Sequence, residues 1–144
     1  MELTKKINVL IIDDEKEIRE TLQRMLERRK YRVFTAGDGE EGLKISRERN
    51  IDIALVDIVM PNMDGLDFLK QVHHFNPKTE VIMITGESTV ERCVKAIEFG
   101  ASSYLLKPVS VNEILRSITK AMKTIEGKEI MLEKAIDHCK QSSK

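Results

Sequence analysis

The chain has 144 residues, enough for one domain with a buried core, and its 24 basic residues balance 24 acidic ones. Zero net charge gives no overall attraction to nucleic acid or to an anionic membrane, and 4% aromatic residues without tryptophan do not suit base stacking. Cys93 and Cys139 lack the spacing of a zinc site, and no early apolar run is long enough for a signal peptide or a membrane span. We therefore expect a cytoplasmic protein that contacts neither nucleic acid nor membranes through this chain.

The first half of the chain alternates apolar runs with segments of helical periodicity. Asn8–Ile12 is an unbroken aliphatic run, which predicts a strand covered on both faces. Apolar residues at helical spacing predict a helix over Lys16–Arg29, and Tyr31–Ala36 is a second short strand. A short helix ending near Asn50 leads to the third strand, Ile53–Val56.

The second half continues the alternation. A helix entered at Asp64 stops before Asn76 and Pro77, and Val81–Ile84 is the fourth strand. The next helix ends at Phe99, where the following glycine can form a left-handed cap. The fifth strand is Ser103–Leu106.

The final helix has a clear beginning and an open end. Ser110 and Glu113 form a capping-box pair at its start, and an apolar stripe runs from there to Ile125. Gly127 then weakens the helix mildly, yet the stripe resumes at seven-residue spacing through Leu132, Ile136 and Cys139. This end can be one long helix, a separate short helix or a frayed charged tail. A stripe so narrow suits packing on the domain or pairing with a second copy.

Five strands alternating with five helices predict an α/β fold with a parallel sheet and helices on both faces. The common strand order is 2-1-3-4-5, the flavodoxin-like arrangement, whose switch point lies between the first and third strands. Residues 5–125 are expected to form this domain, and residues 126–144 a C-terminal helical extension or a truncated linker helix.

The predicted order brings three carboxylates together at the carboxyl edge of the sheet. Asp13 and Asp14 follow the first strand, and Asp57 follows the third. Three such groups cannot all ionise cheaply, so either one stays protonated or a cation joins them. An all-oxygen, partly hydrated cluster suits Mg²⁺, which also binds phosphate oxygens.

Two further residues end strands on the same edge. Thr85 offers a hydroxyl donor, and Lys107 offers a mobile positive charge. Acids for a metal, a hydroxyl and an ammonium group together form a site for a phosphoryl group. Asp57, at the centre, is the natural nucleophile for an aspartyl phosphate.

The sequence resembles the receiver domain of bacterial two-component response regulators over roughly residues 5–125. The residues that carry this resemblance are, in order, Asp13-Asp14, Asp57, Met60-Pro61, Asp64-Gly65, Thr85-Gly86 and Lys107-Pro108. Each pair alone is weak, but all of them in order, each near a predicted strand end, form a specific pattern.

The resemblance implies a function as a phosphorylation-activated switch. Asp57 would accept a phosphoryl group from a phosphohistidine on a sensor histidine kinase. Mg²⁺ would be bound directly by Asp14 and Asp57, by Asp13 through water, and by the backbone carbonyl of Val59. Lys107 would contact the phosphate and precede Pro108 through a cis peptide bond.

The resemblance also implies an output. Thr85 would move toward the phosphate and Tyr104 would rotate inward behind it, which would reshape the face formed by the fourth helix, fifth strand and fifth helix. The partner on that face would be a downstream effector protein or a fused output domain, and the chain could pair as a homodimer. Val59 and Glu87, each two residues beyond a site residue, would tune the lifetime of the phosphoryl group.

Two other classes of function compete with the switch. A Mg²⁺-dependent phosphatase with an aspartyl intermediate usually has an acid two residues after the nucleophile, where this chain has Val59. A flavin-binding protein of the same architecture needs a phosphate loop rich in hydroxyls and glycine after the first strand, where this chain has acids. We therefore expect no enzyme acting on a separate metabolite, only catalysis of the chain's own phosphoryl transfer and slow dephosphorylation.

Overall fold

A computed structural model of the chain describes residues 6–86 and 89–142. Strands and helices alternate along it. The strands are β1 (Asn8–Ile12), β2 (Arg32–Ala36), β3 (Ile53–Asp57), β4 (Glu80–Thr85) and β5 (Ser103–Leu106). The helices are α1 (Lys16–Arg28), α2 (Gly39–Glu48), α3 (Gly65–Phe75), α4 (Val90–Glu98) and α5 (Val111–Ser142). Glu87 and the outermost residues of the expected 5–144 span lie outside the described residues.

The five strands form one parallel sheet in the order β2-β1-β3-β4-β5. This confirms the predicted α/β fold and its flavodoxin-like order. From β1 the chain first adds β2 on one side and then continues with β3 on the other side. The loops that leave β1 and β3 therefore run to opposite faces of the sheet and leave a crevice between them. The carboxyl ends of β1 and β3 are therefore the place where side chains from distant segments can meet.

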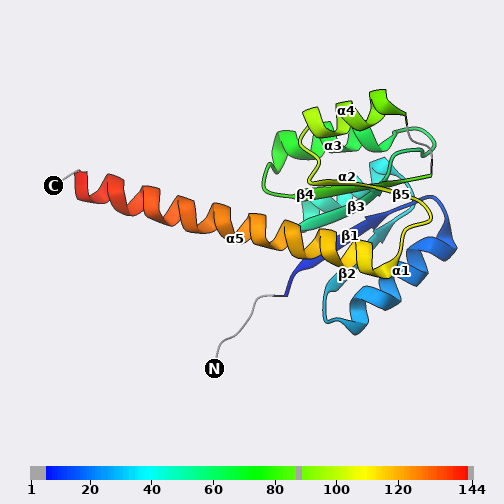
Figure 1. The fold of residues 1–144 in the computed structure, drawn as a ribbon, viewed down its shortest axis with the longest axis horizontal. Coiled ribbons are helices and arrows are strands. Elements are labelled where there is room, and N and C mark those ends of the chain that lie inside the picture. Colours follow the sequence, from blue (N-terminus) through cyan, green and yellow to red (C-terminus); the bar gives the residue numbers. More distant parts are fainter. Residues whose placement is uncertain (1–5, 87–88, 143–144) are drawn as a thin grey trace.

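Helices cover both faces of the sheet (Figure 1). One core packs α2, α3 and α4 on one face, around the fully buried Phe68. The other core packs α1 and α5 on the opposite face, around Leu26 and Ile118. Neighbouring residues of β1 alternate between the two cores, with Leu10 in the first and Ile11 in the second, which explains why the strand is apolar from Val9 to Ile12.

Local signals in the sequence account for several element ends. The Ser110 hydroxyl accepts a hydrogen bond from the Glu113 backbone N–H at 3.1 Å, and the Glu113 carboxylate accepts one from the Ser110 backbone N–H at 3.4 Å. This is the predicted capping box. Gly100 follows α4 with φ of 95°, a left-handed conformation that favours glycine. The Asp64 side chain caps α3 by accepting from the Asp67 N–H at 2.9 Å.

The last helix, α5, is a single helix of 32 residues that passes through Gly127 without a break. The sequence left open whether this end is one helix or two, and the structure has one. Beyond Lys128 its described side chains are exposed, and the helix projects away from the body of the domain (Figure 1). The domain boundary expected at residue 126 therefore lies within a helix and stays a prediction. Among the described helices, none combines the length and apolar character needed to cross a bilayer.

Candidate functional site

Three carboxylates converge where β1 and β3 end. One carboxylate oxygen from each of Asp13, Asp14 and Asp57 lies within 4.8 Å of the others. Asp13 and Asp57 are only 4% and 6% exposed, whereas Asp14 faces solvent. The predicted meeting of these residues at the switch point is thus present in the structure. A compact acidic cluster with one open side can receive a ligand from solvent.

The ammonium group of Lys107, at the end of β5, completes the cluster. Its Nζ lies 3.1 Å from an oxygen of Asp13 and 3.1 Å from an oxygen of Asp57, and 4.0 Å from the exposed Glu15. The Lys107–Pro108 peptide bond is cis, as the resemblance implied. One cation therefore bridges two buried acids, which leaves the group of Asp13, Asp14, Asp57 and Lys107 with a net negative charge.

The surroundings shift the pKa of two of these groups. Burial raises the pKa of the Asp57 carboxyl above its ordinary value, although the hydrogen bond and charge of Lys107 act in the opposite direction. Burial alone would lower the pKa of the Lys107 ammonium, but its hydrogen bonds to Asp57 and Asp13 outweigh burial and raise it. Lys107 consequently stays charged near neutral pH, while the ionised Asp57 is held in an environment that disfavours its charge.

Backbone contacts fix the direction of the acidic side chains. The Val59 N–H donates to one oxygen of Asp57 at 3.1 Å, and the Glu15 N–H donates to one oxygen of Asp13 at 2.9 Å. Each carboxylate thus offers one oxygen to the backbone and the other to Lys107. Glu15, the residue at the N-cap of α1, makes no side-chain cap hydrogen bond.

The other predicted residues lie around the cluster. Thr85 ends β4 with a fully buried side chain, on the strand next to Asp57, and its carbonyl accepts from the Lys107 N–H at 2.8 Å. Tyr104 packs against the core under α4, and its hydroxyl is buried without a hydrogen-bond partner among the residues described. The side chain of Val59 is 39% exposed. Their predicted roles in catalysis, metal binding and switching stay predictions.

The donor set fits a hard divalent cation. All the side-chain ligands offered are carboxylate oxygens, two of them held by the fold and one exposed, and the cluster carries more negative than positive charge. Mg²⁺ prefers few carboxylates and keeps several waters, so a cluster open to solvent on one side suits it. The residues that would hold it are Asp13, Asp14 and Asp57, with the Val59 carbonyl as the expected further ligand.

Comparison with known proteins agrees with this geometry. Residues 9–119 match the family model of the response regulator receiver domain, which covers most of the chain. The chain belongs to this family. Among curated proteins, the receiver is 34% identical over 117 residues to the transcriptional regulatory protein ZraR of Klebsiella oxytoca. The match covers 81% of this chain and 26% of ZraR, so the chain spans about a quarter of the length of this relative.

Solved structures show the same fold. A CheY-like receiver domain protein from Methanospirillum hungatei is 31% identical, with a TM-score of 0.84 over 86% of this chain and 99% of that one. A response regulator from Burkholderia pseudomallei with a phosphorylated aspartic acid and a calcium ion is 32% identical, with a TM-score of 0.75 over 92% of this chain and 75% of that one. TrrA of Thermotoga maritima, solved with Mg²⁺ and a beryllium fluoride group, is 29% identical, with a TM-score of 0.73 over 80% of this chain and 98% of that one.

Two residues that support the receiver site had no assigned role in the sequence analysis. Arg19 of α1 donates to the Asp13 carbonyl at 2.8 Å and so fixes the end of β1. Gly65 begins α3 directly against β3, where a Cβ atom would lie 2.5 Å from the Asp57 carbonyl oxygen. The turn after Asp57 can fold back only because this position has no side chain. The Asp-Gly pair of the resemblance was the signal for Gly65, whereas nothing in the sequence marked Arg19.

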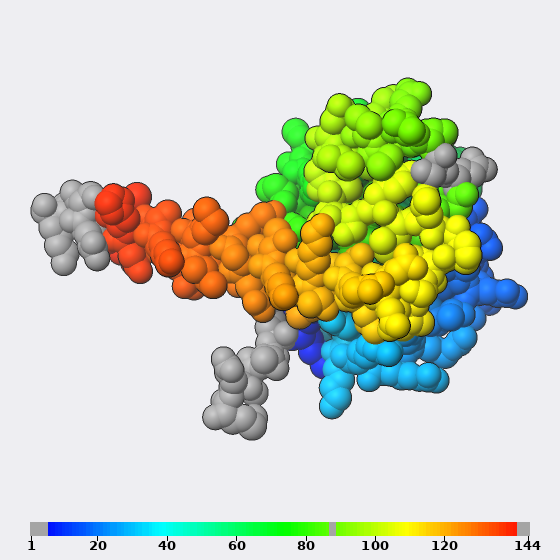
Figure 2. Space-filling model, viewed as in Figure 1, coloured from blue at the N-terminus to red at the C-terminus, as the bar shows by residue number. Residues whose placement is uncertain are grey.

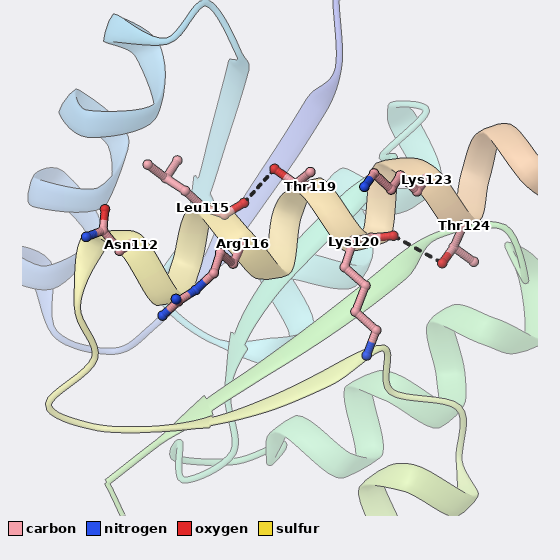
Figure 3. A pocket seen from close by; sticks show the side chains of 7 residues that line it. All are labelled: Asn112, Leu115, Arg116, Thr119, Lys120, Lys123 and Thr124. Atoms are coloured by element: carbon pink, nitrogen blue, oxygen red, sulfur yellow. Dashed lines mark hydrogen bonds between the residues drawn. The ribbon is translucent and has the colours of Figure 1, made fainter.

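Two hollows lie at different distances from the site. A cleft of about 660 Å³ between α1 and α5 ends at Asp13, Asp57 and Lys107 and is otherwise mostly apolar. A shallower hollow lies on the outer face of α5, where Arg116, Lys120 and Lys123 give it a basic lining (Figure 3). No predicted site residue lines this second hollow. The cleft is therefore the surface through which a partner can approach the acids, and the basic hollow belongs to another face.

Proposed function

We propose that the chain is a phosphorylation-activated switch in which Asp57 accepts a phosphoryl group from a phosphohistidine of a sensor histidine kinase. The observation that carries this proposal is the position of Lys107, which bridges Asp57 and Asp13 at 3.1 Å beside a third carboxylate. The nucleophile Asp57, the ammonium group of Lys107 and the carboxylates that would hold a metal ion therefore lie together at a site that is open to solvent on one side. A membership in the receiver family supports the same assignment.

The chemistry requires little from the chain beyond positioning and charge. A carboxylate oxygen of Asp57 attacks phosphorus, an O–P bond forms, the P–N bond to the donor breaks, and the imidazole leaves with the electron pair. Lys107 offsets the charge of the phosphoryl oxygens, and the Thr85 hydroxyl donates to one of them. Bound Mg²⁺ supplies further positive charge to the same oxygens. The raised pKa of Asp57 makes its ionised oxygen a stronger base than an exposed carboxylate.

The kinase would approach over the cleft between α1 and α5. Ile18, Leu22 and Met25 of α1 are half-buried there and offer an apolar surface directly beside the acids. A helical segment of the donor protein can bury this surface while placing its phosphohistidine at the open side of the cluster. The kinase would then dock and transfer its phosphoryl group at the same edge of the sheet.

The output would lie on the face of α4, β5 and α5, which the space-filling view presents as one continuous surface (Figure 2). Large apolar side chains are exposed along it, at 82% for Val90, 63% for Ile97 and 52% for Leu106. Such a set marks a surface for a protein partner. Phosphorylation adds about −1.5 to −2 charge beside Thr85, and the buried Tyr104 hydroxyl lies under the same face. The downstream effector or fused output domain would read this face.

The proposed role is signalling and not turnover of a metabolite. A phosphatase would need an acid to protonate its leaving group, and the position two residues beyond Asp57 carries the aliphatic side chain of Val59. Catalysis would be limited to the chain's own phosphoryl transfer and slow hydrolysis. A cytoplasmic location, the absence of nucleic-acid and membrane binding, and pairing as a homodimer remain predictions of the same account.

The test is incubation with phosphoramidate or acetyl phosphate and Mg²⁺, followed by intact mass measurement. The wild type should gain the mass of one phosphoryl group and lose it slowly once the donor is removed while Mg²⁺ is kept. Asp57→Asn should gain nothing, whereas Asp67→Asn, which changes an exposed acid on α3, should behave as the wild type. Equal labelling of Asp57→Asn and wild type would contradict the proposal.

A further inference from the structure

The C-terminal part of α5 exposes apolar side chains that the domain does not cover. Leu132 is 49% exposed and Ile136 is 44% exposed, and the helix around them stands clear of the other elements (Figures 1 and 2). This segment lies beyond the residues that match the receiver family model. Its apolar character therefore serves something other than the receiver core.

These side chains continue the buried face of the helix. Ile114, Ile118 and Ala121 are almost fully buried against the sheet. Leu132 follows Ile114 by about five full helical turns, because an α-helix repeats every 3.6 residues, so both point to the same side. The stripe of Leu132, Ile136 and Cys139 thus faces the side on which the domain lies, but past the end of the sheet. We call this exposed apolar stripe beside the domain the shelf.

The direction of the shelf is fixed by an ion pair at its base. Lys128 donates to the carboxylate of Glu80 at 3.0 Å, and Glu80 also accepts from the Ser102 hydroxyl at 2.8 Å. The Glu80 side chain is only 8% exposed, so this contact anchors the helix to the start of β4. The shelf is held ready for a partner without a need to order the helix first.

We propose that the shelf binds the same shelf of a second copy of this chain, with the two helices antiparallel. The spacing of Ile125, Glu129, Leu132, Ile136 and Cys139 alternates between four and three residues, as in a coiled-coil seam. In an antiparallel pair, Leu132 lies opposite Ile136 of the second copy, and Glu129 lies opposite Cys139.

The position of the domain favours the antiparallel direction over a parallel pair. The stripe faces the same side as the domain, so a parallel partner would bring its own domain into the space of the first one. A parallel pair would also place Glu129 against Glu129, which is unfavourable between like charges. The antiparallel pair brings Glu126, near the start of the shelf, beside Lys140 of the other copy. Opposite charges then flank the apolar contacts at both ends, whereas Glu133 lies beside Glu133 of the other copy at the centre.

The area that the two helices bury determines how strongly the two copies associate. Residues 128–140 cover about 20 Å of helix, since each residue adds about 1.5 Å. Two helices overlapping over this length bury less than the roughly 1,200 Å² of a standard stable interface. The association should therefore be reversible and depend on protein concentration.

Disulfide trapping tests the proposal, with Cys93→Ser removing the cysteine of α4. The two Cys139 residues of an antiparallel pair are offset by ten residues, about 15 Å along the helix, whereas a disulfide needs Cα atoms within about 7 Å. The protein with Cys139 alone should therefore form no covalent dimer under mild oxidation. Adding Glu129→Cys should produce a covalent dimer, and a further Cys139→Ser should abolish it.

A second variant checks that the apolar contact drives the pairing. Ile136→Lys in the Glu129→Cys protein should lower the yield of covalent dimer about tenfold, which corresponds to about 1.4 kcal/mol. Receiver folding is checked by circular dichroism, because Ile136 lies outside the domain core. A covalent dimer of the protein with Cys139 alone would show a parallel pair and overturn the proposal. A monomer at every accessible concentration in sedimentation, with no trapping of the Glu129→Cys protein, would also overturn it.

Discussion

Replacing Asp57 by asparagine should stabilise the metal-free protein. The Lys107 Nζ lies 3.1 Å from Asp57, an attraction of about 5 kcal/mol at an effective dielectric constant of about 20. The Asp13 carboxylate lies within 4.8 Å and opposes it with about 3 kcal/mol, and the exposed Asp14 adds a smaller, screened repulsion. The remaining attraction of at most about 2 kcal/mol does not offset burial of the carboxylate, which costs several kcal/mol.

The direction of the Asp57 pKa shift leads to the same conclusion, that the ionised carboxylate destabilises the metal-free folded protein. A carboxyl whose pKa is raised in the folded state binds its proton more tightly there than in the unfolded chain. Stability then falls as pH rises from the ordinary value of 3.8 through the raised pKa, and the ionised group is a net cost above it. The advantage of Asp57→Asn should therefore be full near neutral pH and disappear on acidification.

The assay is thermal unfolding of both proteins in EDTA and in Mg²⁺. We expect Asp57→Asn to gain about 1–2 kcal/mol in EDTA, which corresponds to roughly 3–6 °C in Tm for a chain of this size. Mg²⁺ at about 100 times its Kd should add about 2.7 kcal/mol to the wild type and less to the variant, because one ligand is lost. A variant less stable than the wild type in EDTA, or equal stabilisation of both by Mg²⁺, would refute the reasoning.

Three further changes test other parts of the account. Gly65→Ala should cost about 2–3 kcal/mol in urea unfolding, because its Cβ would lie 2.5 Å from a backbone oxygen, whereas Gly127→Ala, with nothing within 4 Å, should gain about 1 kcal/mol. Ser110→Ala should lower the free energy of unfolding by about 1 kcal/mol through loss of the cap, and an unchanged midpoint would argue against the capping box. Val59→Asn should change the rate of spontaneous dephosphorylation, since an amide can orient water and an aliphatic group cannot. Identical decay of the phosphorylated wild type and variant would rule this out.

The sequence predicted the layout of the sheet because its strands are unbroken apolar runs and its breaks are marked by glycine, proline and capping residues. The convergence of Asp13 and Asp57 followed from that layout, since the carboxyl ends of β1 and β3 must meet at the switch point. Bounds differ slightly: β3 extends to Asp57 and β4 begins at Glu80, because polar residues at strand ends carry no apolar signal.

Contacts between distant segments could not be predicted in this way. The ion pair of Lys128 with Glu80 joins residues 48 positions apart, and either residue alone resembles an ordinary surface charge. The continuity of α5 was left open because Gly127 weakens a helix by only about 1 kcal/mol, which neighbouring residues can outweigh. The exposure of Val90 and Ile97 on α4 was also invisible, since helical spacing of apolar residues does not say whether a partner covers them.

The central claim is that Asp57 is the phosphoryl acceptor, and chemical mapping of the acyl phosphate tests it most directly. After incubation with phosphoramidate and Mg²⁺, borohydride reduces an aspartyl phosphate to homoserine, which peptide sequencing by mass spectrometry can locate. The account predicts homoserine at residue 57 alone, dependent on both the donor and Mg²⁺. Homoserine at residue 13 or 14, or phosphate retained on a histidine with residue 57 unmodified, would contradict it.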